Sequence, residues 1–142
     1  MNMSCWSKKQ QRLKVLVLEK TILKSIKMES KKFAEQWIKS WNAHSLEEIL
    51  SHYSDDIEIT TPMIKMATGN ESGSLKGKEN VSEYWKKALE KIPDLHFELY
   101  DVTEGVNCIA LYYKSVLNKN AVELMFFNKE GKVCKMVACY TN

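Results

Sequence analysis

Residues 108–127 read CIALYYKSVLNKNAVELMFF, and this stretch decides the fold. Two apolar runs, at 108–117 and 121–127, flank the polar triplet NKN, which predicts two strands joined by a short turn. Because a short turn can only join antiparallel neighbours, the two strands must pair side by side. The same pattern continues outward on both sides, in residues 95–104 and 132–141. The second half of the chain therefore predicts a four-stranded antiparallel meander.

Helical spacing dominates the residues before these strands. Between Val81 and Ile92 the apolar residues recur at i, i+3, i+4, i+7, i+8 and i+11, and Pro93 ends the pattern. Residues 33–41 show a second apolar helical face, and residues 45–53 begin with a capping box, Ser-x-x-Glu, before a third apolar stripe. Helices followed by a run of strands are typical of an α+β fold rather than of alternating βαβ units.

Two further segments lie between these helices. Residues 57–61 predict one additional strand, which Pro62 should end. Residues 67–78 contain three of the five glycines and are expected to form a loop. This loop lacks the GxxxxGK[ST] spacing of a phosphate-binding loop, so no nucleotide site is predicted there.

The first 29 residues form a basic extension to a domain that spans residues 30–142. Residues 1–30 hold seven basic and two acidic groups, whereas the rest of the chain holds 14 basic and 16 acidic groups. The domain is thus mildly acidic, and no nucleic-acid partner is expected. For the extension, a poorly ordered tail, a true start at Met28, a membrane-surface amphipathic helix and a targeting peptide remain open.

The composition argues against several other classes of protein. No apolar run approaches the roughly 18 residues of a membrane span, so no stable membrane insertion is expected. The four cysteines and three histidines show no zinc-ligand spacing, which predicts reduced thiols, no metal and no cofactor. We therefore expect a cytoplasmic protein, and the scarcity of arginine beside lysine favours a bacterial source.

Glu123 is the strongest candidate for chemistry. It interrupts the apolar strand AVELMFF, where its carboxyl group either faces solvent on one side of the sheet or is held in an apolar site. Burial would raise the pKa of the carboxyl group and keep it protonated, able to donate a hydrogen bond. Asp55 and Asp56 also look like an acid pair, but their position between a helix and a strand favours local capping.

The order of these motifs resembles the nuclear transport factor 2-like superfamily, and specifically its SnoaL-like branch. The stretches that carry the resemblance are WIKSWNAH at 37–44, YSDDIE at 53–58, GSLKGK at 73–78, PDL at 93–95 and ELMFF at 123–127. The resemblance implies a curved antiparallel sheet wrapped around N-terminal helices, a cone with an apolar pocket, and a homodimer formed through the outer sheet face.

Within this fold, the ketosteroid isomerases allow a comparison at three positions. Where they carry a tyrosine that donates to the substrate, this chain has Trp37. Where they carry an aspartate as general base, it has Thr61, and their protonated aspartate falls at Glu123. Because threonine is not a plausible base near neutral pH, isomerisation by that mechanism is not expected.

The sequence therefore predicts a protein that binds a small apolar molecule, with Glu123 as polar anchor or catalytic acid. The residues expected around the pocket are Trp37, Trp41, His44, Tyr53, Thr61, Tyr84, Tyr113 and Phe127. Two alternatives stay open. One is a dimeric scaffold with a filled pocket. The other is a proton-transfer enzyme (an isomerase, cyclase or dehydratase), which would need His44, His52 or Asp56 close to Glu123.

Overall fold

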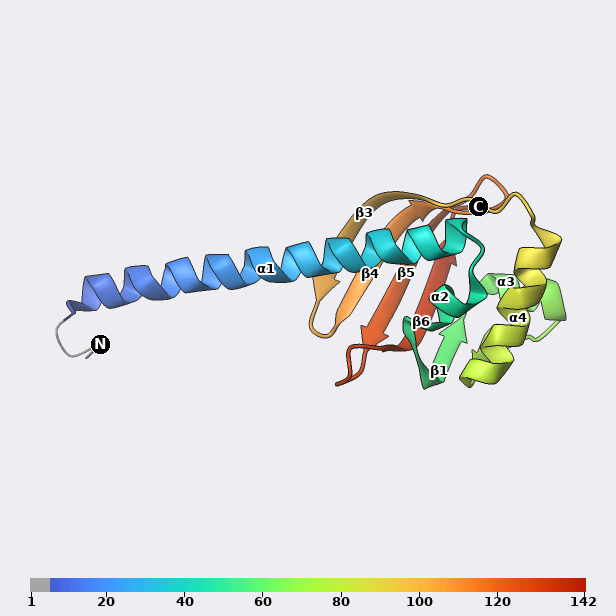
Figure 1. The fold of residues 1–142 in the computed structure, drawn as a ribbon, viewed down its shortest axis with the longest axis horizontal. Helices are drawn as coiled ribbons and strands as arrows, with labels where there is room; N and C mark the ends of the chain where they lie inside the picture. The colour runs from blue at the N-terminus through green and yellow to red at the C-terminus, as the bar shows by residue number, and fades with distance from the viewer. Residues whose placement is uncertain (1–5) are drawn as a thin grey trace.

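A computed structural model describes residues 6–142, and within them four helices and one six-stranded sheet form an α+β fold (Figure 1). The strands lie in the order β2-β1-β6-β5-β4-β3. The predicted meander is confirmed. Its members are β3 (Glu98–Gly105), β4 (Cys108–Lys114), β5 (Asn120–Phe127) and β6 (Val133–Tyr140), each antiparallel to the next.

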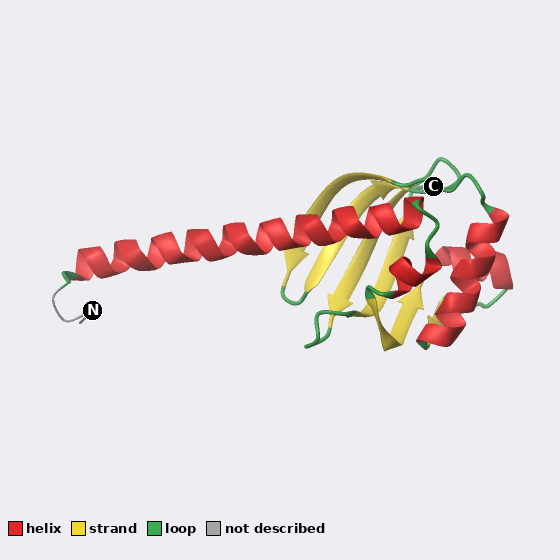
Figure 2. Ribbon diagram, viewed as in Figure 1, coloured by secondary structure: helices red, strands yellow, loops and turns green. Residues whose placement is uncertain are grey.

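Helix α1 (Lys8–Asn42) is one continuous helix that crosses one face of the sheet and extends well beyond it (Figures 1 and 2). It begins at a capping box formed by Ser7 and Gln10, so helix formation does not wait for residue 30. The beginning of the helix exposes apolar side chains such as Leu13 and Leu23, whereas Ala34 and Trp37, further along, are buried. The boundary predicted at residue 30 remains a prediction.

Helix α2 (Leu46–Leu50) follows a turn and is capped differently from the sequence prediction. The Ser45 hydroxyl accepts a hydrogen bond from the backbone N–H of Glu48, as predicted. The reciprocal bond from the Glu48 side chain is absent, because the Ser45 N–H donates to the Ser40 carbonyl instead. The helix is also shorter than predicted, since Tyr53 already belongs to the first strand.

Strand β1 (Tyr53–Thr60) gives the sheet its one parallel pair. It pairs antiparallel with β2 (Ser74–Lys76) on one side and parallel with β6 on the other. The curved sheet is therefore mixed rather than purely antiparallel, and it does not close, because β2 and β3 are its edges.

Two predictions for the segment after β1 need correction. Pro62 does end the strand, but it does so by starting helix α3 (Pro62–Thr68), because its missing N–H costs nothing at the first helical position. The predicted loop at 67–78 holds the end of that helix and all of β2. Helix α4 (Lys78–Lys91) follows and matches the strongest helical pattern in the sequence.

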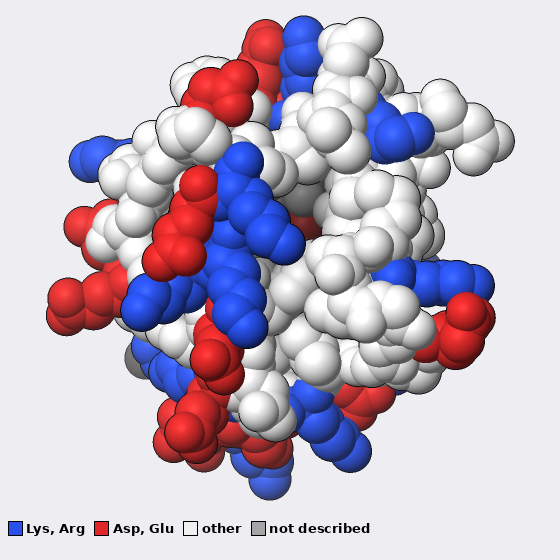
Figure 3. All heavy atoms as spheres, turned by 90° about the vertical axis from the view of Figure 1, so that its right-hand side faces the viewer, with Lys and Arg blue, Asp and Glu red and all other residues white. Residues whose placement is uncertain are grey.

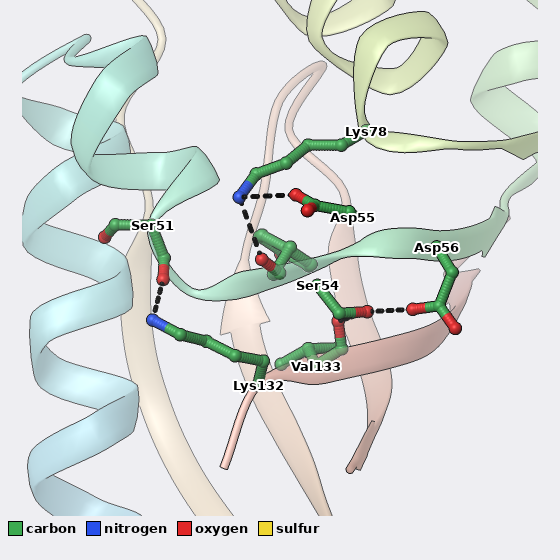
Figure 4. Close-up of polar contacts among 8 residues, drawn as sticks. Ser51, Ser54, Asp55, Asp56, Lys78, Lys132 and Val133 are labelled. Carbon is green, nitrogen blue, oxygen red and sulfur yellow. Dashed lines mark hydrogen bonds and ion pairs between the residues drawn. The ribbon is translucent and has the colours of Figure 1, made fainter. Parts of the chain in front are cut away.

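Two lysines hold the start of β1 in place (Figure 4). The Lys132 ammonium donates to the Ser51 carbonyl at 2.6 Å, and the Lys78 ammonium donates to the Tyr53 carbonyl at 3.0 Å. Lys78 also lies 3.8 Å from the fully exposed carboxylate of Asp55. These contacts join α4 and the β5–β6 turn to the strand that begins beside them.

The second aspartate has a local role as well. The Ser54 hydroxyl donates to Asp56 at 2.6 Å and lies 3.4 Å from the Val133 carbonyl of β6 (Figure 4). Both aspartates therefore lie within β1 and make local side-chain contacts there, and neither caps a helix as the sequence had favoured.

Two further predictions concern membrane insertion and the cysteines. Within residues 6–142, no helix combines the length and the apolar character that crossing a membrane requires. Cys108, Cys134 and Cys139 are free thiols, and Cys5 lies outside the described residues.

Candidate functional site: an aromatic cavity around Glu123

A cavity of about 370 Å³ lies where the end of α1, helices α3 and α4 and the inner face of the sheet meet. Figure 3 shows this side of the molecule, with a hollow at its centre. The volume is within the range of small-molecule sites in proteins. The walls are mainly apolar, and the aromatic rings among the lining residues are Trp37, Trp41, Tyr84, Trp85, Phe97, Tyr113 and Tyr140.

Two polar side chains at and just after the end of α1 position part of the cavity wall. The Asn42 side chain donates to the Phe97 carbonyl at 2.9 Å and accepts from the Phe97 N–H at 2.7 Å. The His44 Nε2 lies 2.8 Å from the Leu95 carbonyl, and because a carbonyl only accepts, this nitrogen must carry the hydrogen. Together they tie the segment before β3 to the helix, which places Phe97 against Trp37 and Trp41.

The alternation of β5 turns Glu123 into the cavity. Side chains of successive strand residues point to opposite faces, and Ala121, Glu123 and Met125 are all buried while Val122 and Leu124 are exposed. Glu123 is only 3% exposed. Of the two orientations that the sequence allowed, the structure shows the inward one.

The Glu123 carboxyl group has one protein partner. The Tyr113 hydroxyl donates to Oε2 at 2.6 Å. The two residues are diagonal neighbours, because Tyr113 on β4 pairs with Ala121, two residues before Glu123 on β5. The other oxygen, Oε1, has no hydrogen-bond partner among the described residues. Oε1 is not fully enclosed by protein atoms. Because Glu123 lines the cavity, this oxygen is open to the cavity.

Burial dominates the electrostatics of Glu123. Loss of hydration raises the pKa of its carboxyl group from 4.5 to about 7, and the hydrogen bond from Tyr113 opposes the rise, because it favours the charged form. A carboxyl group with this pKa populates both its neutral and its charged form near neutral pH. It can therefore donate a hydrogen bond to a ligand or accept one.

The tyrosines around Glu123 remain protonated. Burial and the negative charge of Glu123 raise the pKa of Tyr140, although hydrogen bonding with Thr61 and Tyr113 works against the rise. Burial likewise raises the pKa of Tyr113 well above its ordinary value, with the charge of Glu123 as the next cause. These phenols can act as hydrogen-bond donors, and Glu123 is the group that titrates near neutral pH.

Six of the predicted site residues line this cavity. Five come from α1, α4, β4 and β5 and the sixth, Thr61, lies between β1 and α3; the six are Trp37, Trp41, Thr61, Tyr84, Tyr113 and Glu123. Thr61 also caps α3, because its hydroxyl accepts from the Met63 N–H at 3.2 Å.

The other three predicted pocket residues are not part of the lining. His44 is occupied with Leu95, as described above. Tyr53 lies behind the wall, fully buried, where its hydroxyl accepts from Trp37 Nε1 at 2.8 Å. Phe127 packs edge-on against Phe33, with ring centroids 5.1 Å apart, beside a separate groove at the β3–β4 turn.

The partners expected for a proton-transfer reaction are also absent from the lining. His52 is half-buried against Phe33, its Nδ1 lies 3.2 Å from the Ile49 carbonyl, and burial lowers its pKa. Neither His44, His52 nor Asp56 is among the residues that line the cavity. Among residues 6–142 there is also no group of three or more His, Cys, Asp or Glu side chains that could hold a metal ion.

Several residues that line the cavity were not predicted from the sequence, although the helical spacing could have identified some of them. Tyr84, Lys87, Ala88 and Lys91 follow each other at i, i+3, i+4 and i+7, so the two lysines share a face of α4 with a residue that was predicted. Ser115 had no such signal, because its place depends on how β4 ends against the cavity.

Comparisons with known proteins agree with this architecture. A family model described as a SnoaL-like domain matches residues 34–136. A SnoaL-like protein of unknown function from Burkholderia thailandensis is 42% identical, with a TM-score of 0.78. The match covers 80% of this chain and 94% of that chain. No curated protein gave a match.

More distant structures share the fold. An NTF2-like protein from Cytophaga hutchinsonii is 14% identical, with a TM-score of 0.61 over 79% of this chain and 89% of its own. A protein with a cystatin-like fold from Methylobium petroleophilum is 11% identical, with a TM-score of 0.64 over 82% of this chain and 78% of its own. At these identities the similarity concerns the fold alone.

Proposed function

The chain belongs to the SnoaL-like family, and we propose that it binds a small, mostly apolar molecule in the cavity around Glu123. The fold hosts many activities, so this proposal is based on the site rather than on the family. The observation that carries it is a buried carboxyl group with one oxygen open to an aromatic cavity. Leaving such an oxygen unpaired is unfavourable, and a ligand that reaches it would supply the missing hydrogen bond.

The size and walls of the cavity support binding over a purely structural role. A scaffold with a filled interior would leave no space beside Glu123, whereas a cavity of about 370 Å³ lies there. The aromatic rings offer apolar contact area with little conformational entropy to lose. They surround one carboxyl group, which favours a ligand with a large apolar part and a hydrogen-bonding group at the end that meets Glu123.

Binding of the apolar fluorophore 1-aminoanthracene tests the proposal. We expect its fluorescence to rise on binding, and Glu123→Gln to change the affinity by about fivefold, as expected for about 1 kcal/mol between a charged and a neutral hydrogen bond. Ala88→Trp should abolish binding, because Ala88 lines the cavity and an indole would fill it. If the fluorophore binds this variant as well as it binds the native protein, the proposal is wrong.

Two control variants keep the experiment specific. Glu130→Gln removes an exposed acid in the β5–β6 turn, and Lys86→Trp adds an indole to an exposed position of α4 that does not line the cavity. Both should bind the fluorophore with native affinity.

Acid–base catalysis by Glu123 is a second candidate, favoured by the pKa of about 7. A group that titrates near the working pH is suited both to accept and to donate a proton. If the protein is an isomerase, cyclase or dehydratase, its kcat/KM should change with a pKa near 7 that is lost in Glu123→Gln. A turnover that Glu123→Gln leaves unchanged would exclude this role.

We also propose that the protein forms a homodimer through the outer face of its sheet. This face exposes apolar side chains that a monomer would leave in water, and its members are Tyr100, Tyr112, Val122, Leu124 and Phe126. Sedimentation equilibrium should give twice the chain mass for the native protein and the chain mass for Val122→Lys/Leu124→Lys. A native protein that sediments as a monomer at high concentration would contradict this assembly.

A further inference from the structure

The rim of the cavity differs in charge from its interior. Lys87 and Lys91 line the cavity from α4, one helical turn apart, and both are exposed. Figure 3 shows basic side chains directly beside the hollow. Neither lysine forms an ion pair with another residue of the described part of the chain. Two cationic groups are therefore free to meet a ligand at the mouth.

The interior imposes the opposite requirement on the ligand. Glu123 is the one acidic residue in the lining, and it lies behind the aromatic walls with one oxygen open to the cavity. A ligand anion placed there would meet a buried carboxyl group of the same sign, in an environment that screens charge poorly. A ligand cation would have to pass the two lysines. An uncharged hydrogen-bonding group suits the inner end best.

We propose that the ligand is a small amphipathic anion, with its charged group held at the mouth by Lys87 and Lys91 and an uncharged hydroxyl or carbonyl group at Glu123. The apolar part between these two ends packs against the aromatic walls. This inference names the chemical class of the molecule and rests on the proposed binding function.

The cavity also limits the size of this molecule. At about 30 Å³ per water molecule in the liquid, 370 Å³ corresponds to roughly a dozen waters, and hence to a ligand of roughly a dozen non-hydrogen atoms. A chain of about ten carbons with a polar group at each end has this size.

Three probes of equal length separate the effect of charge from that of shape. They are 10-hydroxydecanoic acid, 1,10-decanediol and 10-amino-1-decanol, which at pH 7.5 carry a negative charge, no charge and a positive charge at one end. Calorimetric titration should give the tightest binding for the acid and the weakest for the amine. Because an exposed ion pair contributes about 0.2–1 kcal/mol, two lysines should favour the acid over the diol by about 2- to 30-fold. Raising the salt concentration should reduce this preference.

Charge reversal at the mouth provides the decisive variant. In Lys87→Glu/Lys91→Glu we expect the order to invert, so that the amine binds more tightly than the acid, while the affinity for the diol changes less than twofold. The control Lys86→Glu/Lys129→Glu makes the same change in net charge at exposed positions outside the lining. It should keep the native order.

The possible results distinguish the inference from the function on which it rests. If the diol binds the native protein as tightly as the acid, and reversal of the two lysines has no effect on the order, the inference is overturned while binding in the cavity stands. If none of the three probes binds the native protein, both the inference and the proposed function are wrong.

Discussion

Replacing Glu123 by glutamine should change how the stability of the domain depends on pH. Burial raises the pKa of Glu123 from 4.5 to about 7, so between these values the folded protein keeps a proton that the unfolded chain has released. The free energy of unfolding must therefore fall as the pH rises through this window. At 1.36 kcal/mol per pH unit, the loss amounts to about 3 kcal/mol.

Urea unfolding of the native protein and of Glu123→Gln, from pH 4 to pH 9, measures this effect. We expect the native free energy of unfolding, minus that of the variant, to be constant below pH 4.5, to fall by about 3 kcal/mol up to pH 7, and to be constant above it. The exposed acid Glu130 provides the control, because Glu130→Gln should leave the pH profile unchanged in this window. A difference that stays flat, or that rises with pH, would refute the account of Glu123 as an acid destabilised by burial.

Three further predictions concern the surroundings of Glu123. Tyr113→Phe removes the donor to its carboxylate and should raise the pKa of Glu123 further above 7, visible as a shift of its carboxyl carbon titration in NMR spectra. Trp37→Phe and Tyr53→Phe each leave one partner of a buried hydrogen bond unpaired and should cost about 1–3 kcal/mol, whereas the double variant should cost clearly less than the sum in urea unfolding. Gly73→Ala should lower the thermal midpoint, because φ is +63° and the new Cβ would lie 3.1 Å from a backbone oxygen.

The sequence predicted the meander well because its signals are local. For β4 and β5 these signals are two apolar runs and the short polar turn between them, and they sufficed to place both strands. The pairing of β1 with β6 is different, since Tyr53 and Val133 lie far apart in the chain and no local pattern records a parallel partner. Strand β2 was missed because three residues are too few to show alternation.

The extent of α1 was underestimated for a related reason. Periodicity reports the burial of one helix face, and the apolar residues near the start of α1, such as Leu13, Leu16 and Leu18, are more than half exposed and spread around the axis. This part of the helix is continuous with the packed part that contains Trp37, and it buries no apolar face against the sheet. A pattern search therefore recognises only the packed part.

Residues of the candidate site could be predicted where the residue type and its neighbours in the sequence indicate burial. Glu123 was identified because a charged residue within an apolar strand is unusual, and the fold then placed it inside. Tyr53 and Phe127 were misplaced because an aromatic residue on the inner face can line a cavity or fill the core behind it. The sequence pattern around such a residue is the same in either position. Which of the two applies depends on packing in three dimensions.

A crystal structure of the protein soaked with 1,10-decanediol tests the central claim most directly, since this neutral probe does not depend on the lysines at the mouth. We expect electron density for the probe inside the cavity, with one hydroxyl oxygen about 3 Å from the Glu123 carboxyl group. A cavity closed by the side chains that line it, or a probe bound only on the outer face of the sheet, would contradict the claim that this cavity is a binding site.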